Sequence, residues 1–157
     1  MDDSLDFLRL FHSLLRYGVL LSVGAAGFVA LVGYIRKSHI ITWERTLAIV
    51  AMIMCHVQLL IGLAMYASRF KMYGATTKNG YQTGMSPMVR NFWKYEHIGI
   101  MILAIALVTI GRSLSKRAAS ESGKQLRVAI FYLIAMVLFL WGTPWPFTAI
   151  GHGRFWL

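Results

Sequence analysis

Charged residues, and acidic ones above all, are scarce in this chain. Its 157 residues include 6 Asp and Glu against 16 Lys and Arg, and charged residues make up only 14%. A soluble domain carries roughly 25%. Hydrophobic residues make up 57% and are gathered in long runs, as in chains solvated by lipid. The basic excess flanks these runs without interleaved aromatics, so we expect membrane lipid and no nucleic acid as its partner.

Cysteine is almost absent, and so is any sign of a cleaved leader. Cys55 is the single cysteine, which excludes an intrachain disulfide framework and a thiolate metal cage. The chain begins with the acidic stretch Met1-Asp2-Asp3, and no small-residue cleavage site follows it. We therefore expect the first apolar run to be retained as a membrane span rather than removed as a signal peptide.

Four apolar runs are long enough to cross a bilayer, which takes about 20 residues for about 30 Å of hydrocarbon. They cover residues 14–35, 46–67, 92–111 and 128–147. Lipid cannot hydrogen-bond an open sheet edge, so each run is predicted to be an α-helix. Short links make neighbouring helices antiparallel. The prediction is an all-α integral membrane protein, with residues 1–157 forming one up-down-up-down bundle of four transmembrane helices.

The Lys and Arg residues divide equally between the two predicted sides of the membrane. One side carries Arg36, Lys37, Arg45, Arg112, Lys116, Arg117, Lys124 and Arg127. The other carries Arg9, Arg16, Arg69, Lys71, Lys78, Arg90, Lys94 and Arg154. The first set is concentrated in short links beside helix ends, which is where positive charge sets orientation. We therefore predict that both termini lie outside the cytoplasm.

Three of the five histidines lie in or beside apolar runs, namely His12, His56 and His97. A polar ring inside a span normally faces the bundle interior and has a partner. That partner is either a shared ligand or another helix, through a hydrogen bond. His39 lies in a basic link and His152 in the C-terminal tail, where both are expected to be solvated surface residues.

The depth of each histidine follows from the helical rise of about 1.5 Å per residue. From the basic residue at the inner end of each run, His56 lies at about 16 Å, His97 at about 22 Å and His12 at about 36 Å. The reference residues are Arg45, Arg112 and Arg36. This predicts that His56 and His97 share a level on facing helices. They could then ligate the iron of one haem b, with His12 as the substitute for either.

Two basic residues lie close to these histidines in the sequence. Arg16 is one helical turn from His12, and Lys94 is three residues before His97. Either could pair with a haem propionate. The alternatives are snorkelling of Arg16 to the outer headgroups and anchoring of Lys94 at the membrane interface.

Several short segments resemble small four-helix bacterial membrane proteins described as "cytochrome b". They are residues 12–16 (HSLLR), 56–62 (HVQLLIG), 95–97 (YEH), 109–112 (TIGR) and 144–147 (PWPF). The resemblance extends over nearly the whole chain and implies haem-linked electron transfer in a bacterial inner membrane. It implies no assigned substrate. Related four-helix cytochromes with two haems need four ligand histidines, whereas the spans of this chain offer three.

The leading hypothesis is a membrane protein with one haem b that passes electrons between quinol and a redox partner, or serves as a small subunit of a respiratory complex. The alternative is a cofactor-free accessory subunit of a larger membrane complex, whose histidines hydrogen-bond across helices or touch lipid or quinone. A third hypothesis is an enzyme of haem metabolism. It is less favoured, because Glu96 and His12 are the only evident acid–base groups.

Overall fold

The computed structural model describes residues 3–74 and 86–151, with side chains described for residues 7–68 and 86–151. His152 and the aromatic tail residues Phe155 and Trp156 lie outside this part of the chain. Everything regular within it is helical, so the predicted all-α class is confirmed. The segments are α1 (Asp3–Arg36), α2 (Thr42–Gly74), α3 (Pro87–Asn91), the π-helical turn η1 (Phe92–Glu96), α4 (His97–Arg117) and α5 (Glu121–Gly142).

Four helical stretches are long and apolar enough to cross a membrane, which confirms the predicted multi-pass architecture. They are Phe7–Arg36, Thr42–Ser68, Pro87–Arg117 and Glu121–Gly142. The third stretch joins α3, η1 and α4 into one continuous helical segment. The first three predicted spans lie inside these stretches, and the fourth is displaced.

The fourth span begins and ends earlier than residues 128–147. It begins after Ser120, whose hydroxyl accepts a hydrogen bond from the backbone N–H of Gly123 and so caps α5. It ends at Gly142, because Thr143 is extended (φ −84°, ψ 127°) ahead of Pro144. The link between α4 and α5 is therefore only residues 118–120, much shorter than the predicted link over residues 112–127.

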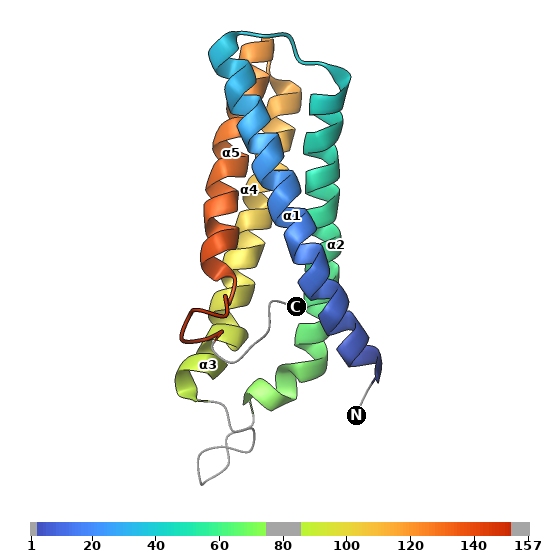
Figure 1. The fold of residues 1–157 in the computed structure, drawn as a ribbon, viewed down its shortest axis with the longest axis vertical. Coiled ribbons are helices and arrows are strands. Elements are labelled where there is room, and N and C mark those ends of the chain that lie inside the picture. Colours follow the sequence, from blue (N-terminus) through green and yellow to red (C-terminus); the bar gives the residue numbers. More distant parts are fainter. Residues whose placement is uncertain (1–2, 75–85, 152–157) are drawn as a thin grey trace.

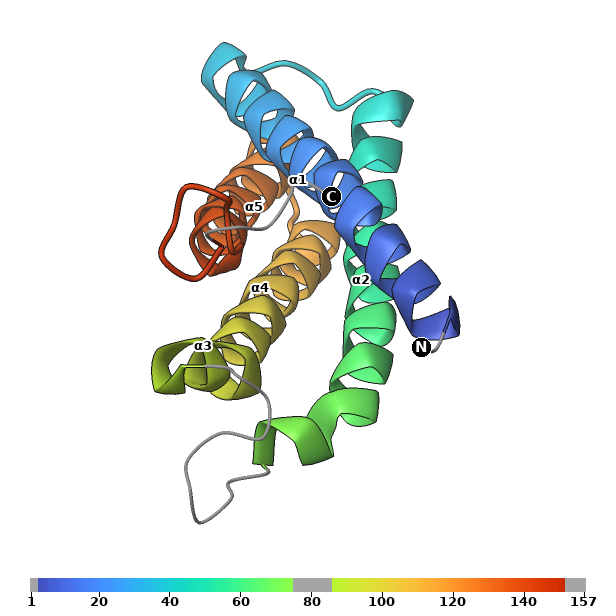
Figure 2. The same ribbon diagram turned by 60° about the horizontal axis from the view of Figure 1, so that its bottom comes forward.

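The helices run alternately up and down the long axis of the bundle (Figure 1). α1 packs extensively against α2 and α5, and α4 packs extensively against α5. The contact between α2 and α4 is smaller. α1 and α4 therefore face each other diagonally across the bundle, with α5 and α2 on either side (Figure 2). Side chains on these two helices can meet only in the bundle interior.

The packed core is built from small and branched side chains around one tyrosine. Tyr132 is fully buried, as are Val23, Val108 and Cys55. Its hydroxyl donates to the carbonyl of Ala48 at 2.7 Å, which satisfies the polar end of an otherwise apolar ring. The core thus ties α5 to α2 through the middle of the bundle.

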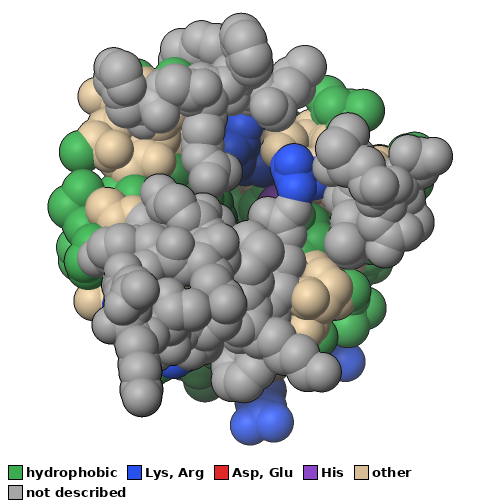
Figure 3. Space-filling model, turned by 90° about the horizontal axis from the view of Figure 1, so that it is seen from below, with side chains coloured by type: hydrophobic (Ala, Val, Ile, Leu, Met, Phe, Trp, Pro, Cys, Tyr) green, Lys and Arg blue, Asp and Glu red, His purple; other side chains and the backbone are tan. Residues whose placement is uncertain are grey.

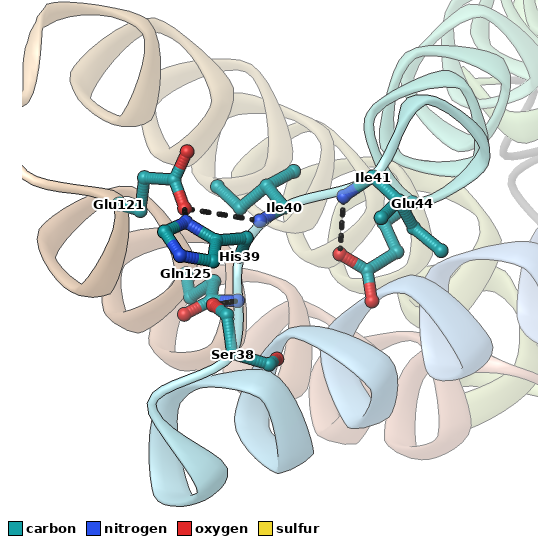
Figure 4. A network of polar contacts seen from close by, with 7 residues as sticks. All are labelled: Ser38, His39, Ile40, Ile41, Glu44, Glu121 and Gln125. Atoms are coloured by element: carbon teal, nitrogen blue, oxygen red, sulfur yellow. Dashed lines mark hydrogen bonds and ion pairs between the residues drawn. The ribbon is translucent and has the colours of Figure 1, made fainter.

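A polar network closes the end of the bundle where α1 turns into α2 (Figure 4). The Glu121 carboxylate lies 2.8 Å from Nδ1 of His39 and accepts from the N–H of Ile40 at 3.2 Å. Gln125 donates to the carbonyl of Ser38 at 3.0 Å. The His39 side chain is 95% exposed, as expected for a residue in a solvated link. The start of α5 thus holds the α1–α2 link in place.

Candidate functional site

A cavity of about 500 Å³ lies between the helices, toward the end where α1 begins and α5 ends. This volume is within the range of about 300–1,000 Å³ that is usual for cofactor and ligand sites. Core residues such as Val19, Ile105 and Phe139 line its apolar part. Seen from that end, basic and histidine side chains show inside a central hollow (Figure 3). None of the described residues that line the cavity is acidic.

His97, at the start of α4, lines this cavity. A hydrogen bond defines the tautomer of its ring. Its Nδ1 lies 2.8 Å from the carbonyl oxygen of Gly142. A carbonyl can only accept, so Nδ1 carries the hydrogen and Nε2 carries the lone pair. This is the arrangement in which a histidine is oriented for ligation by a hydrogen bond from its other nitrogen. The ring also packs against Trp93, with centroids 5.1 Å apart.

The hydrogen bond to His97 depends on a close approach of two helices at Gly142. A Cβ atom at this position would lie 2.8 Å from Cγ2 of Ile100 on α4, which is tighter than side chains normally tolerate. Glycine therefore lets the end of α5 rest on α4 and brings its last carbonyl to the imidazole. Gly142 is an unpredicted part of the site, and its only signal in the sequence is a position just before a Thr-Pro pair.

His12, on the diagonally opposite helix α1, lines the same cavity. Its Nδ1 is buried and has no hydrogen-bond partner among the residues that the structure describes. The ring lies against α2 at Gly62, where a Cβ atom would be 3.2 Å from Cε1 of His12. Gln58, also on α2, donates to the backbone carbonyl of His12 at 2.9 Å. The second imidazole of the site is thus His12, supported from behind by Gly62 and Gln58.

His56 lies outside the cavity, contrary to the expectation that it would face His97. Its side chain is exposed on α2, and its Nδ1 donates to the carbonyl of Met52, one turn back, at 2.7 Å. Its Nε2 is 3.4 Å from Oγ1 of Thr109 on α4. Thr109 is twelve residues beyond His97 on the same helix, a rise of about 18 Å. The structure therefore does not bring His56 and His97 together.

The expected common level was wrong because Arg112 does not mark the end of its helix. α4 continues to Arg117, so depth counted from Arg112 is too small by about 7 Å. The α1–α2 and α4–α5 links lie at one end of the bundle, where α1 ends at Arg36 and α4 ends at Arg117. His12 lies 24 residues from Arg36 and His97 lies 20 residues from Arg117, which correspond to about 36 and 30 Å. His56 lies 14 residues from Thr42, where α2 begins at the same end of the bundle, or about 21 Å. His12 and His97 are therefore the two span histidines that lie closest to each other in depth.

Arg16 lines the cavity one turn beyond His12. Its Nη2 donates to the hydroxyl of Tyr17 at 3.1 Å. Its guanidinium carbon lies 4.8 Å from the centroid of the Tyr17 ring and 5.9 Å from that of Trp145. These aromatic faces hold the cation in the wall of the cavity.

Lys94 does not line the cavity, although it was expected to lie beside His97. It belongs to the π-helical turn, in which the N–H of His97 donates to the carbonyl of Phe92, five residues back. A π turn encloses one residue more than an α turn, so it rotates the residues before it relative to those after it. Lys94 instead places its Nζ 4.9 Å from the centroid of the Tyr95 ring.

The π turn is itself anchored to α2, because the hydroxyl of Tyr66 donates to the carbonyl of Lys94 at 3.1 Å. Trp93, in the same turn, lines the cavity beside His97. Nothing in the sequence predicted this turn, since its residues are compatible with a regular helix. Gln58 could have been found, because a polar amide inside a span usually has an interior partner.

No group of three or more His, Cys, Asp or Glu side chains that could hold a metal ion gathers within the described residues. A haem iron needs only two protein ligands, because the porphyrin supplies the others. Two imidazoles on diagonal helices, one with its lone pair fixed and the other with a buried nitrogen still unpaired, fit such a group. The apolar lining between them also suits a flat apolar macrocycle.

Comparisons with known proteins add no relative to this description. Nothing matches the chain among protein-family models, curated proteins or solved structures. The likeness to small membrane proteins described as "cytochrome b" therefore stays a prediction. The function is therefore inferred from the cavity and from the residues that line it.

Proposed function

We propose that this chain is a b-type haem-binding membrane protein that passes electrons between a quinol and a redox partner. His12 and His97 would hold the iron of one haem. The observation that carries the proposal is the pair of imidazoles lining one cavity from diagonally opposed helices, with Nδ1 of His97 committed to Gly142. His12 thereby takes the place that the sequence had suggested for His56.

The residues around the cavity have separable tasks in this proposal. The Gly142 carbonyl keeps the lone pair of His97 on Nε2 and makes that nitrogen a better ligand. Gly62 leaves room for the ring of His12. Arg16, rather than Lys94, would pair with a propionate, because Arg16 lines the cavity and Lys94 does not. Bound between two histidines, the iron would supply one-electron transfer without an open position for oxygen.

The decisive experiment is an optical spectrum of the purified protein together with a pyridine haem assay. We expect sharp reduced α and Soret bands and one haem b per chain. A preparation that is folded, fully helical by circular dichroism and free of haem after expression with adequate haem supply would overturn the proposal.

The second candidate function is a cofactor-free accessory subunit of a larger membrane complex. It is favoured by polar contacts between helices, namely the hydrogen bond from Gln58 to the backbone of His12 and the approach of His56 to within 3.4 Å of Thr109. In that case the histidines would serve packing alone. Co-purification of other membrane subunits with a haem-free chain would support this second function over the first.

Enlarging Gly62 tests whether the space around His12 matters for haem binding. In Gly62→Val the new side chain would press on the His12 ring, since even a Cβ atom would lie 3.2 Å from it. We expect haem content to fall by about tenfold, the order seen when the support of a metal ligand is removed. Ala64→Val is the matched control, because Ala64 is exposed on the same helix. Equal haem content in both variants would contradict the role given to Gly62.

We also propose that the protein lies in a bacterial inner membrane, with the end that carries the α1–α2 and α4–α5 links in the cytoplasm. Both links are short, and Lys and Arg gather in them or at the helix ends beside them, at Arg36, Lys37 and Arg45 and at Arg112, Lys116, Arg117, Lys124 and Arg127. Such charge is retained on the cytoplasmic side. Both termini would then be periplasmic. Single cysteines placed at Ser38 and Ser120 in a Cys55→Ser background should react with a membrane-impermeant maleimide only after the cells are opened. Labelling of intact spheroplasts would reverse the assigned orientation.

A further inference from the structure

His56 presents a polar ring to the lipid near the middle of a membrane span. It lies 14 residues from Thr42 and 12 residues from Ser68, the two ends of that span, or about 21 and 18 Å. Among residues 47–67, all of which the structure describes, it is the only exposed polar side chain. A polar group is costly at this depth unless something hydrogen-bonds to it.

The geometry leaves one nitrogen of His56 as an acceptor. Nδ1 donates to the carbonyl of Met52 at 2.7 Å, so Nε2 carries the lone pair. The nearest group to Nε2 is the hydroxyl of Thr109, 3.4 Å away. That hydroxyl has a single hydrogen, which it donates to the carbonyl of Ile105 at the shorter distance of 2.8 Å. Nε2 therefore needs a donor that comes from outside the bundle.

The surroundings restrict what this donor can be. Ile53 and Leu60 flank His56 on α2, Ile110 adjoins Thr109 on α4, and all three are about half or more exposed. Acyl chains have no hydrogen-bond donors, and lipid headgroups lie far from this depth. A quinol is apolar enough to reach the bilayer centre and carries hydroxyl donors on its ring. A single acceptor between apolar side chains suits one such hydroxyl.

The site is also adjacent to the proposed haem cavity. Cys55, next to His56, and Ile105, one turn before Thr109, both line that cavity from the inside. Only the wall formed by α2 and α4 separates the exposed ring from it. These are the helices that contact each other less than the other neighbouring pairs do.

We propose that His56 forms a lipid-facing quinol-binding site on the α2–α4 side of the bundle. Nε2 of His56 accepts a hydrogen bond from one quinol hydroxyl, and the apolar side chains around it receive the tail. The inference deepens the proposed function by assigning its electron donor a place. It rests on that function only for the choice of quinol as the ligand.

The test is a binding titration with the purified full-length protein in lipid nanodiscs. The probes are a short-tailed benzoquinol and its dimethyl ether, which lacks both hydroxyls. We expect the quinol to bind about tenfold more tightly than the ether, and His56→Leu to remove that preference. Thr109→Val should keep it within about threefold, because the Thr109 hydroxyl is not the acceptor in this site. His56→Gln, which retains an acceptor, should recover part of it.

Haem content, measured on the same samples, separates this inference from the proposed function. We expect His56→Leu to keep the haem of the wild type while losing the preference for quinol. Unchanged quinol binding in His56→Leu would overturn the quinol site and leave the haem assignment standing. Dissociation of a dimer or of a partner subunit in His56→Leu, with quinol binding unaffected, would overturn it in favour of a protein interface. Absence of haem from every sample would overturn the proposed function, whereas the binding difference could still be read.

Discussion

Replacing His97 with alanine is expected to abolish haem binding, whereas the same change at His56 is expected to leave it intact. Removing the imidazole takes away a ligand whose tautomer is set by Gly142, and the remaining His12 cannot hold the iron from both sides. The occupancy of haem should fall by at least about tenfold, since even losing the partner of a ligand costs about that much. The pyridine haem assay on purified variants measures the difference directly.

The contrast between the two histidines is the informative part of this experiment. His56 is exposed and hydrogen-bonded within its own helix to the carbonyl of Met52, so His56→Ala removes no group from the cavity. Helical content by circular dichroism should be the same in both variants, because His97 lines a cavity and His56 is exposed. Loss of haem in His56→Ala, with haem kept in His97→Ala, would mean that the iron is not held in this cavity.

Adding one methyl group at Gly111 is expected to destabilise the pair formed by α4 and α5. Gly111 is buried, and a Cβ atom there would collide with Cβ of Phe131 and lie 2.9 Å from its Cγ. These atoms are close to the α5 backbone and cannot swing away as the end of a flexible side chain could. Such overpacking costs about 1–3 kcal/mol. We expect Gly111→Ala to lower the free energy of unfolding by this amount.

Gly99→Ala is the matched control, because it lies on the same helix and nothing lies within 4 Å of the added atom. Alanine favours a helix over glycine by roughly 0.5–1 kcal/mol, so this variant should be as stable as the wild type or more stable. Reversible unfolding in mixed micelles, followed by circular dichroism, gives both values. A stability loss of equal size in the two variants would show that the α4–α5 contact at Gly111 is not tight.

The main features of the fold could be predicted from the order of apolar and charged residues alone. Runs of about 20 apolar residues must be helical in lipid, and short links between them must reverse their direction. The predicted limits of the fourth span differ from those of α5, because local interactions determine where this helix begins and ends. Ser120 begins α5 earlier than its apolar run does, and Thr143 ahead of Pro144 ends the helix at Gly142.

The site needed the tertiary structure, because a run of apolar residues does not say which face of a helix turns inward. All three span histidines looked alike in sequence, yet His12 and His97 line the cavity and His56 faces lipid. Two structural facts separate them. The diagonal placement of α1 and α4 directs His12 and His97 to the same interior space. The π turn before His97 rotates Lys94 away from the helix face that lines the cavity.

The sequence by itself therefore determined that the chain crosses the membrane four times as helices, because lipid allows long apolar segments no other form. It also determined which residue types stand inside the spans. Only the tertiary structure decided which of them meet, because that depends on where each helix really ends and how far it is rotated about its axis. α4 ends at Arg117, five residues later than predicted. This difference alone makes His12, and not His56, the histidine closest to His97 in depth.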